Sequence, residues 1–338
     1  MIYLFDLKLN EIEEMVLSMG EPKFRAKQIF SWLSKGKSID EMGNIPASLK
    51  EKLKEVSNAD LPVILRKQES KQDGTRKYLF EFSDGNAIES VFMKYKFGNS
   101  ICVSSQAGCR MGCKFCASTL KGLSRNLSAG EIYSEILAVE KDTGEKISHV
   151  VVMGTGEPFD NYENVSKFIE LINDKNGLNI GMRNITVSTC GIVPAIDRFG
   201  DDFDQVNLAI SLHHTNDESR SALMPINRKY DMKTLLDACR RYAEKTSRRV
   251  TFEYTLVKGV NDSKEDAKAL AGLLKGTLCH VNLIPLNEVK DTGLKTTERE
   301  KALEFQKTLE GLGIPATIRR ELGDDIDAAC GQLRLVQN

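Results

Sequence analysis

From Ile101 onward, short apolar runs alternate with longer segments whose apolar residues recur at helical spacing. Such alternation is typical of a parallel sheet whose strands are joined by right-handed helical crossovers. The predicted strands are residues 101–105, 147–153, 184–189, 206–211, 250–256, 280–284 and 316–319. Capping residues predict helix starts at Ser128, Asp160, Asp231 and Ser263. The repeated units predict an α/β fold with a partial (β/α)6-type barrel.

The first 97 residues follow different patterns. Residues 1–60 carry apolar positions at helical spacing, most clearly from Phe24 to Leu33, and predict a small helical accessory domain. Residues 61–97 contain two β-rich runs on either side of an Asp84-Gly85 turn signal, which predicts a β-hairpin. We therefore expect a helical accessory domain (1–60), a β-hairpin linker or extension (61–97) and a barrel domain (98–338).

Composition is that of an ordinary globular protein, with 41% hydrophobic and 28% charged residues among 338. No apolar run is long enough to span a bilayer, and the first residues lack a secretory leader. We therefore expect a cytoplasmic protein without a membrane partner. Eight cysteines are too few for a disulfide scaffold at this length, so metal-binding or catalytic use is favoured. The net charge of −1 argues only weakly against a nucleic-acid partner.

Three of the cysteines are closely spaced. Cys109, Cys113 and Cys116 form a C-x3-C-x2-C pattern in a loop that Gly108 and Gly112 make adaptable. A structural zinc site normally takes four protein ligands, and no fourth Cys or His lies nearby in the sequence. Three thiolates instead suit a 4Fe–4S cluster with one iron left open. A zinc knuckle is the alternative.

The cysteine spacing, with Phe115 just before the third cysteine, resembles the radical S-adenosylmethionine (SAM) superfamily. In that superfamily the open iron binds the amino and carboxylate groups of SAM. The segment from Gly154 to Pro158 follows the next predicted strand and resembles the Gly-Gly-Glu-Pro strand end that holds the ammonium group of SAM. Chemistry in a barrel belongs at the carboxyl ends of its strands, and both features fall there.

Two further cysteines make the resemblance closer. Cys102 lies on the first predicted strand of the barrel, and Cys330 lies in an acidic, small-residue segment from Gly323 to Leu333. Together with the cluster motif, these segments resemble the family of RlmN- and Cfr-type radical SAM RNA methyltransferases, and most closely its adenine-C2 branch. The resemblance extends from the Phe24–Leu33 segment to Leu333.

The resemblance implies specific roles for these residues. Cys330 would carry an S-methylcysteine intermediate, and Cys102 would resolve the protein–RNA adduct through a transient disulfide with Cys330. Glu89 matches the proton acceptor of the family. One 4Fe–4S cluster and two SAM molecules per turnover are implied. The matching SAM contacts are Gly156, Glu157, Ser188, Ser211, Leu212, His213 and Asn287.

The implied substrates are an adenosine of 23S rRNA at the peptidyl transferase centre and the adenosine 3′ of the anticodon in several tRNAs. The resemblance also implies an electron donor such as flavodoxin or ferredoxin, and a monomer. Three alternatives stay open: methylation at C8 rather than C2, a different radical SAM enzyme, and a zinc-stabilised RNA-binding protein without catalysis.

Overall fold

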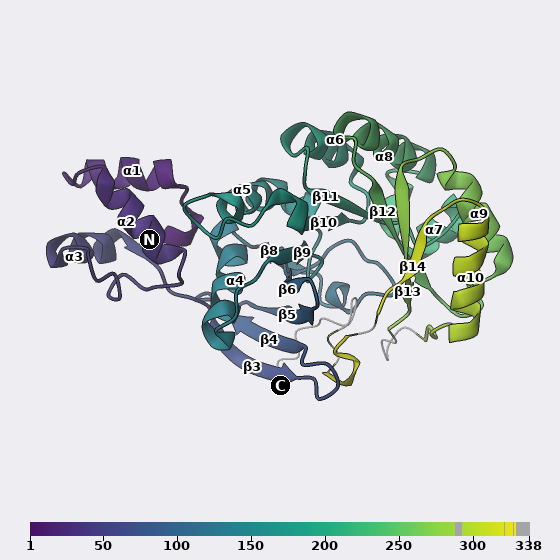
Figure 1. Ribbon diagram of the computed structural model, residues 1–338, viewed down its shortest axis with the longest axis horizontal. Helices are drawn as coiled ribbons and strands as arrows, with labels where there is room; N and C mark the ends of the chain where they lie inside the picture. The colour runs from purple at the N-terminus through teal and green to yellow at the C-terminus, as the bar shows by residue number, and fades with distance from the viewer. Residues whose placement is uncertain (288–292, 321, 327, 329–338) are drawn as a thin grey trace.

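The computed structural model describes residues 1–287, 293–320, 322–326 and 328 (Figure 1). Within these ranges the central sheet has ten strands in the order β14-β13-β12-β11-β10-β9-β6-β5-β4-β3. Their bounds are β3 Val63–Glu69, β4 Arg76–Glu81, β5 Ala87–Tyr95, β6 Gly98–Val103, β9 His149–Val152, β10 Ile185–Thr189, β11 Asn207–Ser211, β12 Val250–Leu256, β13 Cys279–Pro285 and β14 Ala316–Ile318.

In this sheet β6 and the six strands from β9 to β14 are parallel, and the helices that connect them lie along the outer side of the curved sheet (Figure 1). The predicted partial (β/α)6 barrel is therefore confirmed, with β14 added after the last helix. No helix in the described part of the chain is both long and apolar enough to cross a membrane. The helix bounds are α4 Ala129–Thr143, α5 Tyr162–Asn173, α6 Val193–Asp202, α7 Asp217–Leu223, α8 Met232–Thr246, α9 Lys264–Leu274 and α10 Arg299–Gly311.

Three of the four predicted helix starts are confirmed. The side chains of Ser128, Asp231 and Ser263 cap α4, α8 and α9 by accepting hydrogen bonds from backbone N–H groups in the first turn. The prediction for Asp160 is wrong, because it lies in a short 3-10 turn before α5. Its carboxylate accepts hydrogen bonds from Gln106 and Arg110 of the cysteine-bearing loop instead.

The predicted hairpin is β4 and β5, but it does not stand apart from the barrel. Strand β5 pairs antiparallel with β6, so that Val91 lies opposite Cys102 and the hairpin extends the barrel sheet. Strand β3, which the hydrophobic pattern did not predict, continues the sheet beyond β4. Nearly every residue of β3 is exposed, which explains why it lacks the alternation of a half-buried strand.

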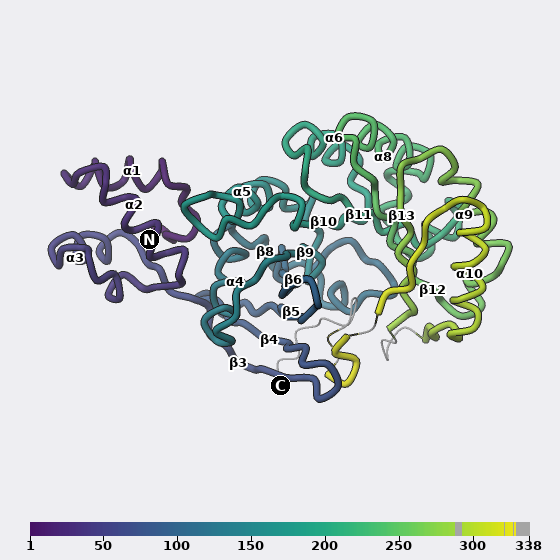
Figure 2. The backbone as a smooth tube through the Cα atoms, in the orientation of Figure 1, coloured from purple at the N-terminus to yellow at the C-terminus, as the bar shows by residue number. Residues whose placement is uncertain are grey.

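The first 58 residues form the predicted helical region, and Figure 2 shows it beside α4 and α5. Its elements are β1 Ile2–Tyr3, α1 Leu9–Ser18, α2 Phe24–Leu33, α3 Ala47–Val56 and β2 Ser57–Asn58. Its apolar side chains join one continuous core with those of the barrel. The Asp6 carboxylate also accepts a 2.6 Å hydrogen bond from the Gly130 N–H at the start of α4, which fixes the helical region to the barrel.

Candidate active site

The loop after β6 folds back on itself around the three closely spaced cysteines. Its two arms pair as short strands, β7 Gln106–Gly108 and β8 Leu123–Asn126. Gly108 has a φ of +80°, and a Cβ added there would lie 2.0 Å from the carbonyl oxygen of Gly122. Only glycine allows this close approach, so the predicted need for a flexible backbone is met at this position.

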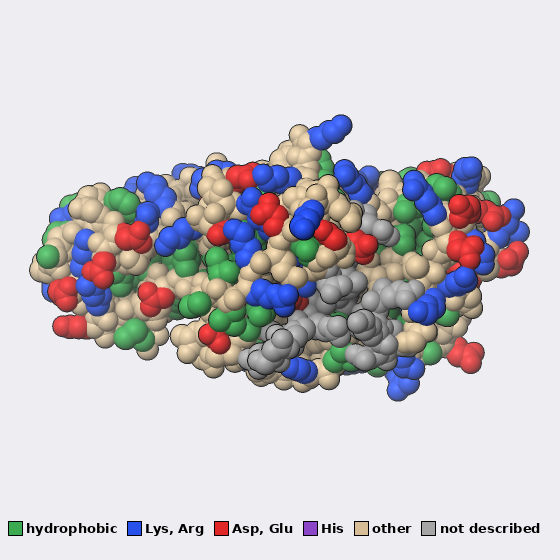
Figure 3. All heavy atoms as spheres, turned by 90° about the horizontal axis from the view of Figure 1, so that it is seen from below, with side chains coloured by type: hydrophobic (Ala, Val, Ile, Leu, Met, Phe, Trp, Pro, Cys, Tyr) green, Lys and Arg blue, Asp and Glu red, His purple; other side chains and the backbone are tan. Residues whose placement is uncertain are grey.

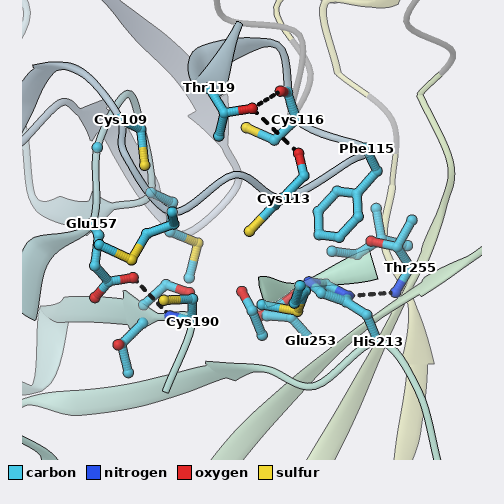
Figure 4. Close-up of a pocket in the computed structure, with 18 of the residues that line it drawn as sticks. Cys109, Cys113, Phe115, Cys116, Thr119, Glu157, Cys190, His213, Glu253 and Thr255 are labelled. Carbon is cyan, nitrogen blue, oxygen red and sulfur yellow. Dashed lines mark hydrogen bonds between the residues drawn. The ribbon is translucent and has the colours of Figure 1, made fainter. Parts of the chain in front are cut away.

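Cys109, Cys113 and Cys116 all line one pocket at the carboxyl end of the barrel strands (Figure 4). Figure 4 shows them on one side of the pocket, with Glu157, Cys190 and Glu253 on the other. Burial raises the pKa of the Cys109 thiol to about 12 and raises that of Cys113 as well. A bound cation would lower these pKa values and favour the thiolate form.

The donor set suits an iron–sulfur cluster. Among the described residues, no group of three or more metal-ligating side chains is close enough to hold a single metal ion. In a 4Fe–4S cluster, by contrast, each thiolate binds an iron of its own, so the sulfur atoms stand further apart. Three cysteine thiols around one pocket fit that arrangement.

The glycine-rich segment after β9 forms the opposite wall. Gly156 has a φ of +112°, and an added Cβ would lie 2.7 Å from the Cβ of Gln106. The Glu157 carboxylate that follows is buried, and its two oxygens accept hydrogen bonds from the N–H groups of Phe159 (3.0 Å) and Cys190 (2.7 Å). Burial raises the pKa of Glu157, and these hydrogen bonds oppose that rise. The carboxylate is thereby fixed in orientation at the pocket wall.

The ends of β10 and β11 complete the pocket through Ser188, Ser211 and His213. The Nδ1 atom of His213 accepts a 3.0 Å hydrogen bond from the Thr255 N–H, so the proton of the neutral ring resides on Nε2. Burial lowers the pKa of His213 to about 3, which keeps the imidazole neutral at physiological pH. Its ring also meets Phe115 edge to face, with centroids 4.7 Å apart, which links the cysteine loop to the end of β11.

Comparisons with known proteins agree with this geometry. Residues 103–271 match the radical SAM superfamily, and residues 2–58 match the ribosomal RNA large subunit methyltransferase N-terminal domain. A probable dual-specificity RNA methyltransferase RlmN from Clostridium perfringens (strain SM101 / Type A) is 56% identical over 333 residues, which cover 98% of this chain and 96% of that protein. This chain belongs to the RlmN family.

Two further similar proteins agree with this assignment. A probable dual-specificity RNA methyltransferase RlmN from Thermoanaerobacter sp. (strain X514) is 52% identical to this chain. The aligned residues cover 99% of this chain and 98% of that protein. The crystal structure of a radical SAM methyltransferase from Sphaerobacter thermophilus superposes with a TM-score of 0.95 at 44% identity and covers 99% of both chains. The family resemblance that the cysteine motifs predicted is confirmed.

Most of the residues expected to bind the cluster or SAM meet in the pocket of this RlmN-family protein. Leu212 lies outside the pocket lining and is fully buried in the core. The predicted residues that line the pocket are Cys109, Cys113, Cys116, Gly156, Glu157, Ser188, Ser211, His213 and Asn287.

Glu89 and Cys102 lie outside this lining, on a neighbouring area of the same sheet. Side chains alternate along a strand, so Glu89 shares a face with Val91, and Val91 lies opposite Cys102. Glu89 forms an ion pair with Lys77, with 3.3 Å between Nζ and Oε1, and both side chains are almost fully buried. Glu89 is therefore a buried, paired carboxylate on the face that carries Cys102, and not an exposed strand residue.

Cys102 contacts the C-terminal segment of the chain. It is 5% exposed and packs in a small apolar cluster with Val91, Met93, Leu322, Ile326 and Ala328. Cys330 lies outside the described residues, two positions beyond Ala328. The described part of the segment therefore approaches the β6 strand that carries Cys102.

Sequence reasoning missed some residues of the pocket. Cys190 is not among the residues that the sequence predicts for the site, yet it lines the pocket and is 6% exposed. Thr255 and Arg319 line it too. Cys190 directly follows β10, so its position at a strand's carboxyl end was the signal that could have identified it.

Proposed function

We propose that this protein is a radical SAM methyltransferase that methylates C2 of adenosine in RNA. The substrates are an adenosine of 23S rRNA at the peptidyl transferase centre and the adenosine 3′ of the anticodon in tRNAs. The observation that carries the proposal is the position of β6, which bears Cys102 and leads directly into the loop of Cys109, Cys113 and Cys116. One strand thus connects the cluster pocket with the surface on which the C-terminal segment packs.

The pocket residues bind and orient SAM. Cys109, Cys113 and Cys116 would hold the 4Fe–4S cluster, and the fixed carboxylate of Glu157 faces the pocket where it can pair with the ammonium group of SAM. The neutral ring of His213 and the amide of Asn287 offer hydrogen bonds without adding charge. The assigned contacts are completed by Gly156, Ser188 and Ser211 in the lining, with Leu212 as a backbone contact.

Cys330 carries the methyl group to the RNA. Its thiolate displaces S-adenosylhomocysteine from a first SAM and becomes S-methylcysteine. A 4Fe–4S cluster held by Cys109, Cys113 and Cys116 would, with a second SAM, supply the radical chemistry that removes a hydrogen atom from this methyl group. Such a radical route is needed because C2 of adenine lies between two ring nitrogens and is too electron-poor to attack a sulfonium methyl group.

Cys102 and Glu89 complete the reaction. Once the methylene carbon is bonded to C2, the adduct radical would return one electron to the oxidised cluster and Glu89 would accept the proton from C2. The thiolate of Cys102 then attacks the sulfur of Cys330, the bond between that sulfur and carbon breaks, and the carbon keeps the electron pair and takes up a proton. The resulting Cys102–Cys330 disulfide is reduced before the next turnover. A flavodoxin or ferredoxin is the proposed electron donor for the cluster.

The domains divide the work of RNA binding and catalysis. We assign residues 1–60 to RNA binding, residues 61–97 to an extension of the sheet, and residues 98–338 to the catalytic barrel. Figure 3 shows basic and acidic side chains interspersed over one face, which favours recognition of folded RNA by shape and by local phosphate contacts. The protein would act as a monomer in the cytoplasm, where both RNA substrates are found.

Mass spectrometry of the Cys330 peptide tests the methyl shuttle. The anaerobically reconstituted protein is given SAM and reductant, and the peptide is expected to gain about 14 Da for one methyl group. Cys330→Ala abolishes this gain. Cys279→Ala serves as the control, because Cys279 is a buried cysteine at the amino end of β13, away from the pocket.

An unmodified Cys330 beside a cluster that cleaves SAM would refute the methyl shuttle. Nucleoside analysis of 23S rRNA and tRNA after turnover then tests the target atom. The proposal requires 2-methyladenosine, and 8-methyladenosine would identify C8 chemistry instead.

A further inference from the structure

Arg220 is a buried arginine close to the pocket. It lies on α7, is 1% exposed, and is the largest fully buried side chain among the described residues. A guanidinium group is charged at every physiological pH, and burying it away from water is costly unless another charge compensates it. The hydrogen-bond acceptors that the structure gives it are nevertheless all neutral.

The guanidinium group of Arg220 forms hydrogen bonds with the carboxyl ends of both β10 and β11 at the pocket. Its Nη2 atom donates to the carbonyl oxygens of Cys190 (2.8 Å) and Ser211 (2.9 Å), which follow β10 and end β11. Its Nε atom donates to the carbonyl oxygen of Leu212 at 3.1 Å. Asn227 accepts a further hydrogen bond from Nη1 at 2.7 Å. One side chain thereby holds the backbone at Ser211 and at Cys190, whose N–H group donates to the Glu157 carboxylate.

The same helix also contacts the cysteine loop. The Lys114 N–H, next to Cys113, donates a 2.9 Å hydrogen bond to the carbonyl oxygen of Leu223 at the end of α7. Cys113, Cys190, Leu223 and Met224 pack together in one apolar cluster. Arg220 is therefore fixed among the cysteine loop, β10 and β11.

We propose that Arg220 is a positioning residue for SAM and the fixed positive charge that compensates the iron–sulfur cluster. This inference rests on the proposed function, because it requires a cluster at Cys109, Cys113 and Cys116. A cluster held by three thiolates becomes more negative when it accepts an electron. A buried cation with no acidic hydrogen-bond partner favours that reduced state, because charges interact strongly in a medium of low dielectric constant. The cluster, in turn, supplies the negative charge that the neutral partners of Arg220 lack.

The two roles predict different effects of two substitutions. Arg220→Gln removes the charge, and we expect the equilibrium constant for one-electron reduction of the cluster to fall at least tenfold, which corresponds to a potential about 59 mV more negative. Arg220→Lys keeps the charge but cannot donate to three carbonyl oxygens in the same geometry. We expect it to keep the wild-type potential and to bind SAM at least tenfold more weakly.

Both quantities are measured on the anaerobically reconstituted full-length protein without RNA. A redox titration followed by EPR gives the potential, and the change in the EPR spectrum of the reduced cluster on SAM addition gives the dissociation constant. Arg198→Gln is the matched control. Arg198 forms a half-exposed ion pair with Glu163 on the outer helices, so its removal is expected to leave both quantities unchanged.

Specific results would overturn the inference. A wild-type potential in Arg220→Gln refutes the electrostatic role, since a purely structural staple would change stability without changing the potential. Wild-type SAM binding in Arg220→Lys refutes the positioning role. If Arg220→Gln does not fold, Arg220→Met, which also removes the charge, replaces it in the test of the potential, and Arg220→Lys still tests SAM binding. A wild-type protein that assembles no cluster refutes the proposed function instead.

Discussion

Replacing Asp73 with Ala should loosen the C-terminal segment from the turn between β3 and β4. The Asp73 carboxylate accepts a 3.0 Å hydrogen bond from the Gly323 N–H and a 2.9 Å hydrogen bond from the Thr75 N–H. A second contact runs the other way, from the Lys71 N–H to the Asp325 carboxylate at 3.1 Å. The segment that leads to Cys330 is thus held at its start by a hairpin turn 250 residues earlier in the chain.

The structure sets the size of the expected effect. A hydrogen bond to a charged group contributes about 1.5–3 kcal/mol when buried. Asp73 is only partly buried, so solvent screening reduces the loss to about 1–1.4 kcal/mol. That loss corresponds to about a five- to tenfold increase in the undocked population. The apolar contacts of Leu322 and Ile326 remain, so the segment is expected to open more often rather than to detach.

Hydrogen exchange measures this opening directly. The Ile326 and Ala328 N–H groups both bond to the Gly323 carbonyl oxygen, at 3.1 and 3.0 Å, and their exchange should accelerate by about the same five- to tenfold factor. The control is Asp84→Ala, which removes the carboxylate that caps the neighbouring hairpin turn at Asn86. Unchanged exchange in Asp73→Ala, or equal acceleration in Asp84→Ala, would refute the reasoning.

The docking should also depend on pH. Partial burial raises the pKa of Asp73, but the hydrogen bonds from Thr75 and Gly323 outweigh it, so the pKa lies below its ordinary value. A carboxyl whose pKa is lowered in the docked state stabilises docking above its unperturbed pKa of about 3.9 and loses that effect as the pH falls through the docked value. Below about pH 4, hydrogen exchange at the Ile326 and Ala328 N–H groups should therefore accelerate in the wild-type protein when compared with exchange in Asp73→Ala at the same pH.

Three further substitutions test the site and its support. Gly156→Ala should weaken SAM binding at least tenfold in equilibrium titrations, because the added Cβ would lie 2.7 Å from the Ser105 hydroxyl at a φ of +112°; unchanged affinity would contradict this. Cys102→Ala should accumulate a covalent protein–RNA adduct on a denaturing gel, and its absence with an intact cluster would remove Cys102 from resolution. Burial raises the pKa of Glu135 well above its ordinary value, so wild-type stability should fall by up to about 1.4 kcal/mol per pH unit above about pH 4.3. The free energy of unfolding of Glu135→Gln, measured by urea denaturation at several pH values, should lack this pH dependence. The same pH dependence in both proteins would contradict the prediction.

The order of strands and helices could be predicted because it depends on local patterns. Each barrel strand is a short apolar run, and the caps at Ser128, Asp231 and Ser263 act within the first turn of their own helices. The cysteine motif is equally local, since its three thiols come from eight consecutive residues. The rule that barrel chemistry lies at the carboxyl ends of strands then placed Glu157, Ser211 and His213 on one rim.

Other features depend on partners that are distant in the sequence. Strand β3 is exposed and has no pattern of its own, so only pairing with β4 identifies it as a strand. Asp160 has the sequence pattern of a helix cap, but its carboxylate accepts hydrogen bonds from Gln106 and Arg110, which are distant in the sequence and close in space. Neither outcome can be derived from neighbouring residues, because a hydrogen bond forms with whichever partner the fold brings within reach.

The sequence by itself determined the family and the barrel and predicted the cluster ligands, because short motifs and periodic burial encode them. Only the tertiary structure decided that Asp73 holds Gly323, and that Arg220 joins Cys190 to Ser211. The physical reason is that burial and electrostatic pairing are properties of three-dimensional neighbourhoods. An arginine in the sequence is by default a solvated surface charge, and it becomes a buried cation beside the cysteine loop only when α7, β10 and β11 enclose it.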